Sequence, residues 1–220
     1  MNPNHPNRFS QAEIDAVYRA IRERRDMRHF IDRPLEEGVL QRLIEAAHMG
    51  PSVGFMQPWR FLRITDGELR RKVHAGVEQE RCRTAEALGQ RSGEFMRLKV
   101  EGILSCAEVL VVGLVGGRER YVFGRRTIPE MDLASAACAI QNFWLAARAE
   151  GIGMGWVSLF DPQQLRELCG MPPDAMPIAI LCVGHVEAFY PAPMLQAEGW
   201  DARRKLCDIV FDNAWGAPKS

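Results

Sequence analysis

Apolar residues recur at the spacing of a helix in two stretches near the start of the chain. Ser10 and Glu13 match the capping box that begins many helices. The apolar positions behind them follow an i, i+3, i+4, i+7 pattern, with members Ile14, Val17, Tyr18 and Ile21. A second stripe follows Pro34 and stops at Gly50-Pro51, with members Leu40, Leu43, Ile44 and Ala47. We expect two amphipathic helices, the first ending between residues 23 and 30.

Four stretches have the composition of strands. Trp59 to Ile64 follows a loop rich in turn formers, and Val109 to Val115 is the continuous valine-rich run of a strand covered on both faces. Gly151 to Phe160 and Ile178 to Val186 complete the set. Helices separate these strands without the regular alternation of a doubly wound fold. The predicted class is α+β, with a mixed sheet flanked by helices.

Three further segments have distinct characters. Met131 to Glu150 is small or apolar almost all round, which predicts a buried helix of the kind found in dimer interfaces. Residues 68–101 are charged and weakly periodic, and we expect them to be helical in pieces, with a mobile lid at about residues 76–100. The tail at about residues 190–220 keeps aromatic side chains and is expected to wrap a partner subunit; these are Trp200, Phe211 and Trp215.

Composition limits the functions that the chain can have. Its 220 residues are 47% hydrophobic, enough for the core of a single domain over residues 1–220. Lys and Arg total 28 and balance 28 Asp and Glu, so no overall field favours nucleic acid or an acidic membrane. The first residues lack an apolar signal segment, and no apolar run is long enough to span a membrane, so we expect a cytoplasmic protein. The six cysteines are scattered along the chain, and we expect them to be reduced thiols.

The first candidate site is the cluster Arg24-Arg25-Asp26-Met27-Arg28. Guanidinium groups match phosphate oxygens with paired hydrogen bonds, so three of them within five residues suit a phosphomonoester. From these residues alone, a solvated charged turn is at least as good an explanation.

Two glycine-containing segments could approach a ligand. In the loop from Pro51 to Trp59, Ser52 and Gly54 could offer hydroxyl and backbone donors, although from these residues alone an ordinary helix-to-strand connector is the better explanation. The string from Gly151 to Ser158, which includes Gly155 and Trp156, follows a helix and enters a strand, the reverse of a dinucleotide-binding fingerprint. A backbone that approaches a ligand and a plain buried strand start both remain open.

Other chemical signatures are missing from the sequence. The histidines show neither HExxH nor another ligand pairing, and the cysteines never reach CxxC spacing, so no metal site is expected. Without a GxSxG elbow or a P-loop, hydrolases and NTP-dependent enzymes lose their best support.

Taken together and in this order, the three segments resemble those of the nitroreductase family. In that family an RR-x-x-R type motif, a PS-x-x-x-x-QPW type loop and an EG-x-G-x-G type stretch surround FMN. Longer strings, such as AAHMGPSVGFMQPW and MDLASAACAIQNFWLAARAEGIGMGWVS, are similar to the branch of the family that consumes its flavin and makes 5,6-dimethylbenzimidazole, the lower ligand of cobalamin. The matching strings cover most of the chain.

The resemblance implies roles for particular residues. Arg24, Arg25 and Arg28 would hold the phosphate and ribityl end of FMN, with Met27 beside them and Arg203 as a further contact from the tail. Ser52 and Gly54 would line the flavin from the other subunit of a homodimer, Gly155 and Trp156 would lie along it, and a lid near Glu94 to Lys99 would close over the ring. Asp26 and Ser158 match the two residues that this branch uses in chemistry.

The resemblance also implies a reaction. Reduced FMN, delivered by a separate flavin reductase, would be the substrate, with O2 as co-substrate and erythrose 4-phosphate as second product. Ordinary nitroreductases carry serine where this chain has Asp26, and a carboxylate among phosphate-binding arginines repels the phosphate unless it serves another purpose. We therefore expect Asp26 to be a general base and Ser158 to orient the ring.

Two rival functions remain open at this point. One is an NAD(P)H-dependent FMN nitroreductase or dehalogenase that recycles its flavin. The other is a non-enzymatic flavin carrier, which would gain from a neutral residue in place of Asp26.

Overall fold

The computed structural model describes residues 6–216, which divide into a first unit ending at Phe189 and a second beginning at Tyr190. The helices of the first unit are α1 (Gln11–Glu23), α2 (Val39–His48), α3 (Gly67–Ala87), α4 (Ser92–Arg97), α5 (Met131–Ala149) and α6 (Pro162–Leu168). Its strands are β1 (Trp59–Ile64), β2 (Glu108–Leu114), β3 (Gly153–Val157) and β4 (Met176–Gly184). The second unit contains the short helix α7 (Met194–Ala197) and a 3-10 turn at Leu206–Asp208.

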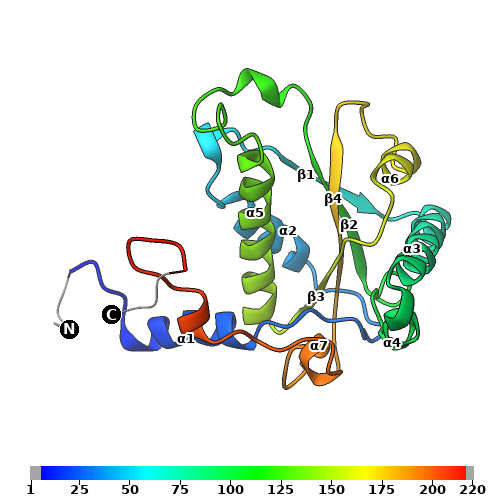
Figure 1. Ribbon diagram of the computed structural model, residues 1–220, viewed down its shortest axis with the longest axis horizontal. Helices are drawn as coiled ribbons and strands as arrows, with labels where there is room; N and C mark the ends of the chain where they lie inside the picture. The colour runs from blue at the N-terminus through cyan, green and yellow to red at the C-terminus, as the bar shows by residue number, and fades with distance from the viewer. Residues whose placement is uncertain (1–5, 217–220) are drawn as a thin grey trace. The chain divides into compact units, whose positions relative to one another are not determined.

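The strands form one sheet in the order β1-β2-β4-β3 (Figure 1). Each neighbouring pair is antiparallel, and Trp59 lies opposite Leu114 while Gly155 lies opposite Cys182. Over residues 6–216 the parallel pairing of the sheet is one isolated bridge between Asp26 and Met154. The α+β class and the helix-flanked sheet are confirmed, and the mixed character of the sheet comes from this bridge alone.

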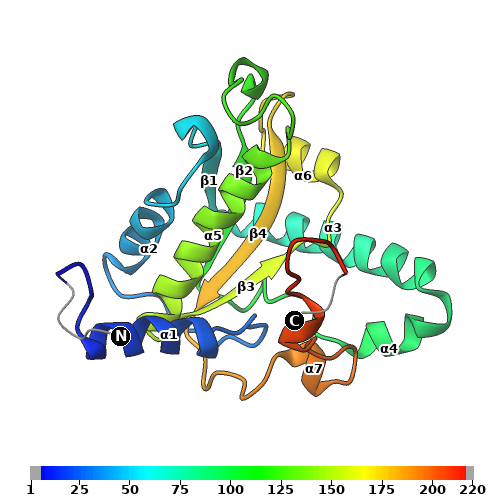
Figure 2. The ribbon, with the colours of Figure 1, turned by 60° about the vertical axis from the view of Figure 1, so that its left-hand side comes forward.

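Both faces of the sheet are covered, which explains why β2 is apolar at every position after its first residue, Glu108. Leu110, Val112 and Leu114 pack in a core formed with α2 and α5, whereas Val109 and Val111 pack in a second core with α3 and α6. Successive side chains of a strand point to opposite faces, so a strand between two cores needs an apolar residue at each position. Figure 2 shows α2 and α5 on one side of β2 and β4, and α3 and α6 on the other.

Helix α1 begins as its sequence predicts. The Ser10 amide donates to the Glu13 carboxylate at 2.8 Å, and the Glu13 amide donates to the Ser10 hydroxyl at 3.4 Å. The first unit nevertheless buries no residue of this helix, and Val17, Tyr18 and Ile21 stay exposed. Helix α5, predicted to be buried, is buried on one side only: Ile140 and Phe143 are fully covered, whereas Leu133 and Cys138 on the other side are exposed.

The charged segment between β1 and β2 is helical in pieces, as predicted. The long α3 is followed by a 3-10 turn at Gly89–Arg91 and by α4. Arg81 of α3 donates to the carbonyls of Met96 and Leu98, at 2.7 and 2.9 Å, and so joins α3 to the end of α4. We call this part of the chain, residues 67–101, the α3–α4 hairpin.

Among the described residues, none of the helices combines the length and the apolar composition that crossing a bilayer requires.

Candidate functional site

The segment Arg24 to Arg28 lies along the outer edge of β3. The Met27 amide donates to the Met154 carbonyl at 2.9 Å, next to the bridge between Asp26 and Met154. Gly155 permits this close approach, because a Cβ at that position would stand only 2.3 Å from the Met27 carbonyl oxygen. The glycine string therefore serves to bring the basic segment against the sheet.

This docking fixes the Asp26 carboxylate. One carboxylate oxygen accepts the Trp156 amide at 2.9 Å, and the other accepts Nη2 of Arg28 at 2.5 Å. The same Arg28 nitrogen donates to the Trp156 carbonyl at 2.8 Å. Arg28 is buried, whereas 41% of the Asp26 side chain is exposed. The carboxylate is thus anchored from behind and reachable from solvent.

Although part of the Asp26 side chain is exposed, the protein packed around its carboxyl removes much of the hydration of the charged form, and this largest influence raises the pKa above the ordinary value of 3.8. Arg28, the Trp156 amide and Arg24 act in the opposite direction and stabilise the charged form. A carboxylate has about four acceptor positions, of which these two hydrogen bonds use half. Asp26 therefore keeps the capacity to accept a proton from a molecule bound beside it.

Arg24 and Arg25 are positioned by a residue that the sequence did not mark as functional. The Trp144 indole of α5 donates to the Arg25 carbonyl at 3.2 Å, and the Arg24 guanidinium lies 4.4 Å from the centre of the same ring. Arg25 also donates to the Arg22 and Arg24 carbonyls at 2.8 Å. The sequence pattern predicts Trp144 to be a core residue of a buried helix. Only its indole N–H, which needs an acceptor when buried, indicates a polar partner.

The charges of this segment fit FMN. The segment carries three guanidinium groups and one carboxylate, which leaves an excess positive charge for a phosphomonoester carrying about −1.5 to −2. Arg24 and Arg25 would hold the phosphate, while Arg28, committed to Asp26 and Trp156, would act closer to the ribityl chain. Ser158 follows β3 directly and is exposed, two residues beyond Trp156.

The loop from Pro51 to Trp59 adopts a conformation that side chains rarely take. A 3-10 turn at Val53–Phe55 contains Gly54 at φ +52°, and Phe55 and Gln57 have φ values of +53° and +46° although neither is glycine. Ser52 accepts the Gln57 amide at 3.1 Å. Strained backbone of this kind concentrates at ligand sites.

Within a single chain, this loop lies far from the basic segment. Ser135 of α5 accepts the Val53 amide at 3.0 Å, whereas Trp144, which contacts Arg25, lies nine residues further along α5, about 13 Å at the helical rise. Ser52 and Gly54 therefore lie at the opposite end of α5 from the basic segment.

Two other residues with predicted flavin contacts lie elsewhere. Lys99 follows α4, with its ammonium 3.8 Å from Glu101, and Arg203 belongs to the second unit. The flavin contacts of both residues stay predictions.

Comparison with known proteins bears directly on this arrangement. The 5,6-dimethylbenzimidazole synthase of Rhodospirillum rubrum is 38% identical over 200 residues, covering 89% of this chain and 94% of the relative. The protein of the same name from Rhodobacter capsulatus is 36% identical over 87% of this chain and 94% of its own length.

Solved structures support the fold. Oxidized iodotyrosine deiodinase bound to FMN and 3-iodo-L-tyrosine matches with a TM-score of 0.70 at 20% identity, covering 90% of this chain and 100% of that one. At that identity the likeness concerns the fold alone. The sequence model described as the nitroreductase family matches residues 21–185, which include the basic segment, the strained loop and the glycine string. The chain belongs to the nitroreductase family of enzymes.

Proposed function

We propose that this enzyme converts reduced FMN and O2 into 5,6-dimethylbenzimidazole and erythrose 4-phosphate, with the pyrimidine part of the flavin leaving as a third product. The observation that carries the proposal is Asp26, a partly exposed carboxylate held among arginines by Arg28 and the Trp156 amide. A site that only retained a phosphorylated cofactor would bind it better with a neutral residue there. Two relatives named for this product, each more than a third identical, support the assignment.

Asp26 would act as the general base. Formation of the benzimidazole requires loss of a proton from C1′ of the ribityl chain, because that carbon becomes C2 of the product. The two anchoring hydrogen bonds aim the carboxylate and leave acceptor capacity free, and a base so placed contributes about 10²–10⁴ in rate. Bound reduced FMN would supply the electrons for O2 as well as the carbon of the product.

Other residues would bind and enclose the substrate. Arg24 and Arg25 would hold its phosphate, and Ser158 would orient the ring by a hydrogen bond. The α3–α4 hairpin, with Lys99 at its end, would close over the ring and exclude water and nicotinamide. Reduced FMN would come from a separate flavin reductase, since a closed lid leaves a nicotinamide no place to stack.

We further propose that the active form is a homodimer. The exposed apolar face of α1 and the uncovered side of α5 need a partner surface, and the strained loop lies too far along α5 to serve the basic segment of its own chain. In a dimer, Ser52 and Gly54 of one subunit would line the flavin of the other. The aromatic tail would wrap the partner.

The decisive experiment incubates the purified protein with chemically reduced FMN in air and separates the products by chromatography. The proposal predicts 5,6-dimethylbenzimidazole in proportion to the flavin lost, and its loss in Asp26→Asn while flavin binding persists. If Asp26→Asn makes product at the wild-type rate, Asp26 is not the base.

The same incubation separates the rivals. Reoxidised, intact FMN together with steady NAD(P)H oxidation in the presence of a nitroaromatic or halogenated acceptor would establish the nitroreductase or dehalogenase. A flavin carrier would leave oxygen consumption at the rate of reduced FMN free in solution.

A further inference from the structure

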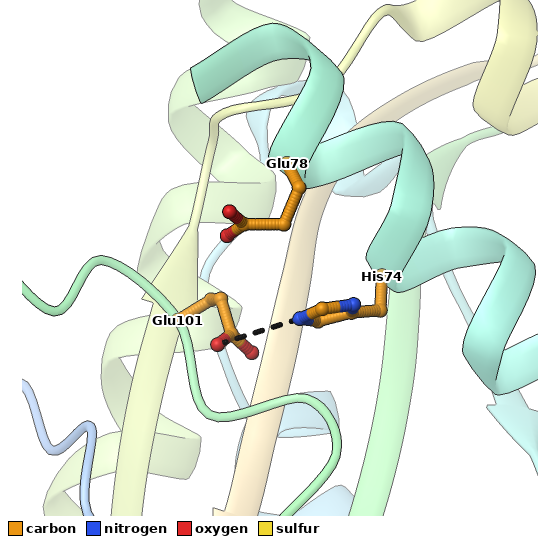
Figure 3. A group of neighbouring side chains, drawn as sticks. All are labelled: His74, Glu78 and Glu101. Carbon is orange, nitrogen blue, oxygen red and sulfur yellow. Dashed lines mark ion pairs between the residues drawn. The ribbon is translucent and has the colours of Figure 1, made fainter. Parts of the chain in front are cut away.

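A second cluster of ligand-type side chains lies in the α3–α4 hairpin, away from Asp26. His74 and Glu78 are four residues apart on α3 and so share one face of the helix, and Glu101 comes from the segment after α4. Their ligand atoms all lie within 4.8 Å of one another. Figure 3 shows the three side chains converging from the two segments.

The surrounding protein orients both carboxylates. One oxygen of Glu101 accepts the Ile103 amide at 2.5 Å, which leaves the other oxygen toward His74. Nη1 of Arg81 approaches the Glu78 carboxylate at 3.3 Å from the same helix. Such outer hydrogen bonds are what fix the ligands in metal sites. The His74 Nε2 atom and Glu101 Oε1 are 3.7 Å apart, too far for a hydrogen bond.

The charges favour a dication. Two carboxylates bring two negative charges to one point, and the imidazole adds a nitrogen ligand of the kind that divalent metals bind in its neutral form. Arg81 stays outside the cluster because it also donates to the Met96 and Leu98 carbonyls. The competing cation is Lys99, 3.8 Å from the same Glu101 oxygen, but its side chain is 40% exposed and can turn into solvent.

We propose that His74, Glu78 and Glu101 bind one divalent transition-metal ion, with Zn²⁺ as the best match. Histidine nitrogen and carboxylate oxygen bind Zn²⁺ at about 2.0–2.2 Å in tetrahedral geometry, so the ligand atoms need to draw together to about 3.3 Å. Three protein ligands leave the fourth position to water. The side chains are only partly buried, which leaves room for this adjustment and a path for the ion.

The ion would clamp the base of the hairpin. It would tie α3 to Glu101, whose neighbour Gly102 packs so tightly on Phe30 that an added Cβ would lie 2.5 Å from the ring. Phe30 in turn follows the basic segment by two residues. This role goes beyond the proposed reaction and involves no flavin.

Sequence patterns could not indicate this site. The helix supplies a His–Glu pair in place of the two histidines of HExxH, and the third ligand lies 23 residues beyond Glu78. Only the return of the chain after α4 brings it to the helix.

The test uses the purified full-length chain, treated with a chelator and titrated with Co²⁺ and then Zn²⁺ without flavin. We expect one ion per chain, with a cobalt spectrum that lacks the thiolate charge-transfer band, and a Zn²⁺-dependent rise in the midpoint of thermal unfolding. His74→Ala and Glu101→Gln should each weaken binding at least tenfold. Lys99→Gln should strengthen it, because the competing ammonium is gone.

Glu80→Gln is the matched control, since it removes the same charge from α3 two residues away, on a different face of the helix. It should leave metal affinity unchanged. A thiolate-type cobalt spectrum, or equal affinity in wild type, His74→Ala and Glu101→Gln, would overturn the proposal whether or not the protein makes 5,6-dimethylbenzimidazole. Absence of binding at millimolar Zn²⁺ would show that the cluster is an ion-pair network only.

Discussion

Asp26 is subject to two opposing influences within a few ångströms. Burial raises the pKa of its carboxyl, and Arg28 at 2.5 Å lowers it. A base used near neutral pH benefits from a pKa moved upward from 3.8, provided that the group remains ionised at the working pH. The Asp26–Arg28 pair therefore sets both the direction in which the carboxylate points and the pH range in which it can accept a proton.

We predict that the turnover number for reduced FMN falls with decreasing pH as Asp26 becomes protonated, because a neutral carboxyl cannot accept the ribityl proton. The acid limb should lie above pH 3.8, since the pKa in the folded protein is raised. Arg28→Gln should move the limb to higher pH, because it removes the strongest influence that lowers this pKa. A pH profile of the turnover number measures the position of the acid limb in wild type and in Arg28→Gln. If the limb lies at the same pH in both proteins, a group other than Asp26 produces it.

Gly155→Ala should disrupt the site without touching a charged group. The added Cβ would lie 2.3 Å from the Met27 carbonyl oxygen, so the basic segment must move away from β3. We expect a loss of about 1–3 kcal/mol in the free energy of unfolding, as for other overpacked positions, together with weaker flavin binding. Denaturant titration and flavin fluorescence measure these effects. Gly93→Ala is the control for stability, since nothing lies within 4 Å of its Cβ, and it should not lower the free energy of unfolding.

At the scale of elements, most of the fold follows from local chemistry. The capping box of Ser10 and Glu13 starts α1 where the sequence places it, and β1 has the predicted bounds of Trp59–Ile64. Asp161 and Pro162 begin α6 as an N-cap and first helical residue. These features depend on residues within one turn or one strand, which a sequence displays directly.

Pairings between distant segments could not be predicted in the same way. The Trp144 indole meets the Arg25 carbonyl across 119 positions of sequence, and the two hydrogen bonds of Asp26 depend on β3 lying beside the basic segment. Residue pattern marked the basic cluster and the glycine string as candidate sites, and the family resemblance implied roles for their residues. It did not show that Arg28 is turned inward to Asp26, because charged residues are usually exposed.

Ser135 links α5 to the strained loop and offers a test at this scale. Ser135→Ala leaves the partly buried Val53 amide without its acceptor, which costs about 1–3 kcal/mol. We expect this loss in urea unfolding, together with a higher KM for reduced FMN if the loop lines the flavin. Thr127→Ala removes an exposed hydroxyl from the segment before α5 and should change neither quantity. If Ser135→Ala is destabilised but its KM for reduced FMN is unchanged, the loop does not contribute to flavin binding.

At the scale of the whole molecule, the unpartnered surfaces are as informative as the core. Helix α1 keeps its apolar face exposed although it has the strong helical pattern of a packed element. Such faces mark interaction surfaces in soluble proteins. In the proposed homodimer, a second copy of this chain would cover this face.

We predict that Val17→Glu converts the protein to monomers, because it places a charge in the centre of the proposed interface. Light scattering coupled to size exclusion should show half the wild-type mass, and product formation should be lost because Ser52 and Gly54 no longer reach the neighbouring flavin. Leu104→Glu, the same kind of change at an exposed leucine between α4 and β2, should leave the mass unchanged. A monomeric Val17→Glu that retains full activity would show that each chain holds a complete site.

The bridge between Asp26 and Met154 has a consequence for solubility. β3 is the last strand of the sheet, and a bare last strand offers its backbone amides to other chains. Here the Met154 carbonyl receives the Met27 amide, and the Trp156 amide is covered by the Asp26 side chain itself. The residue proposed to take a proton from the substrate thus also shields the protein from edge-to-edge aggregation. Catalytic variants at this position therefore need to be checked for self-association before a loss of rate is assigned to chemistry.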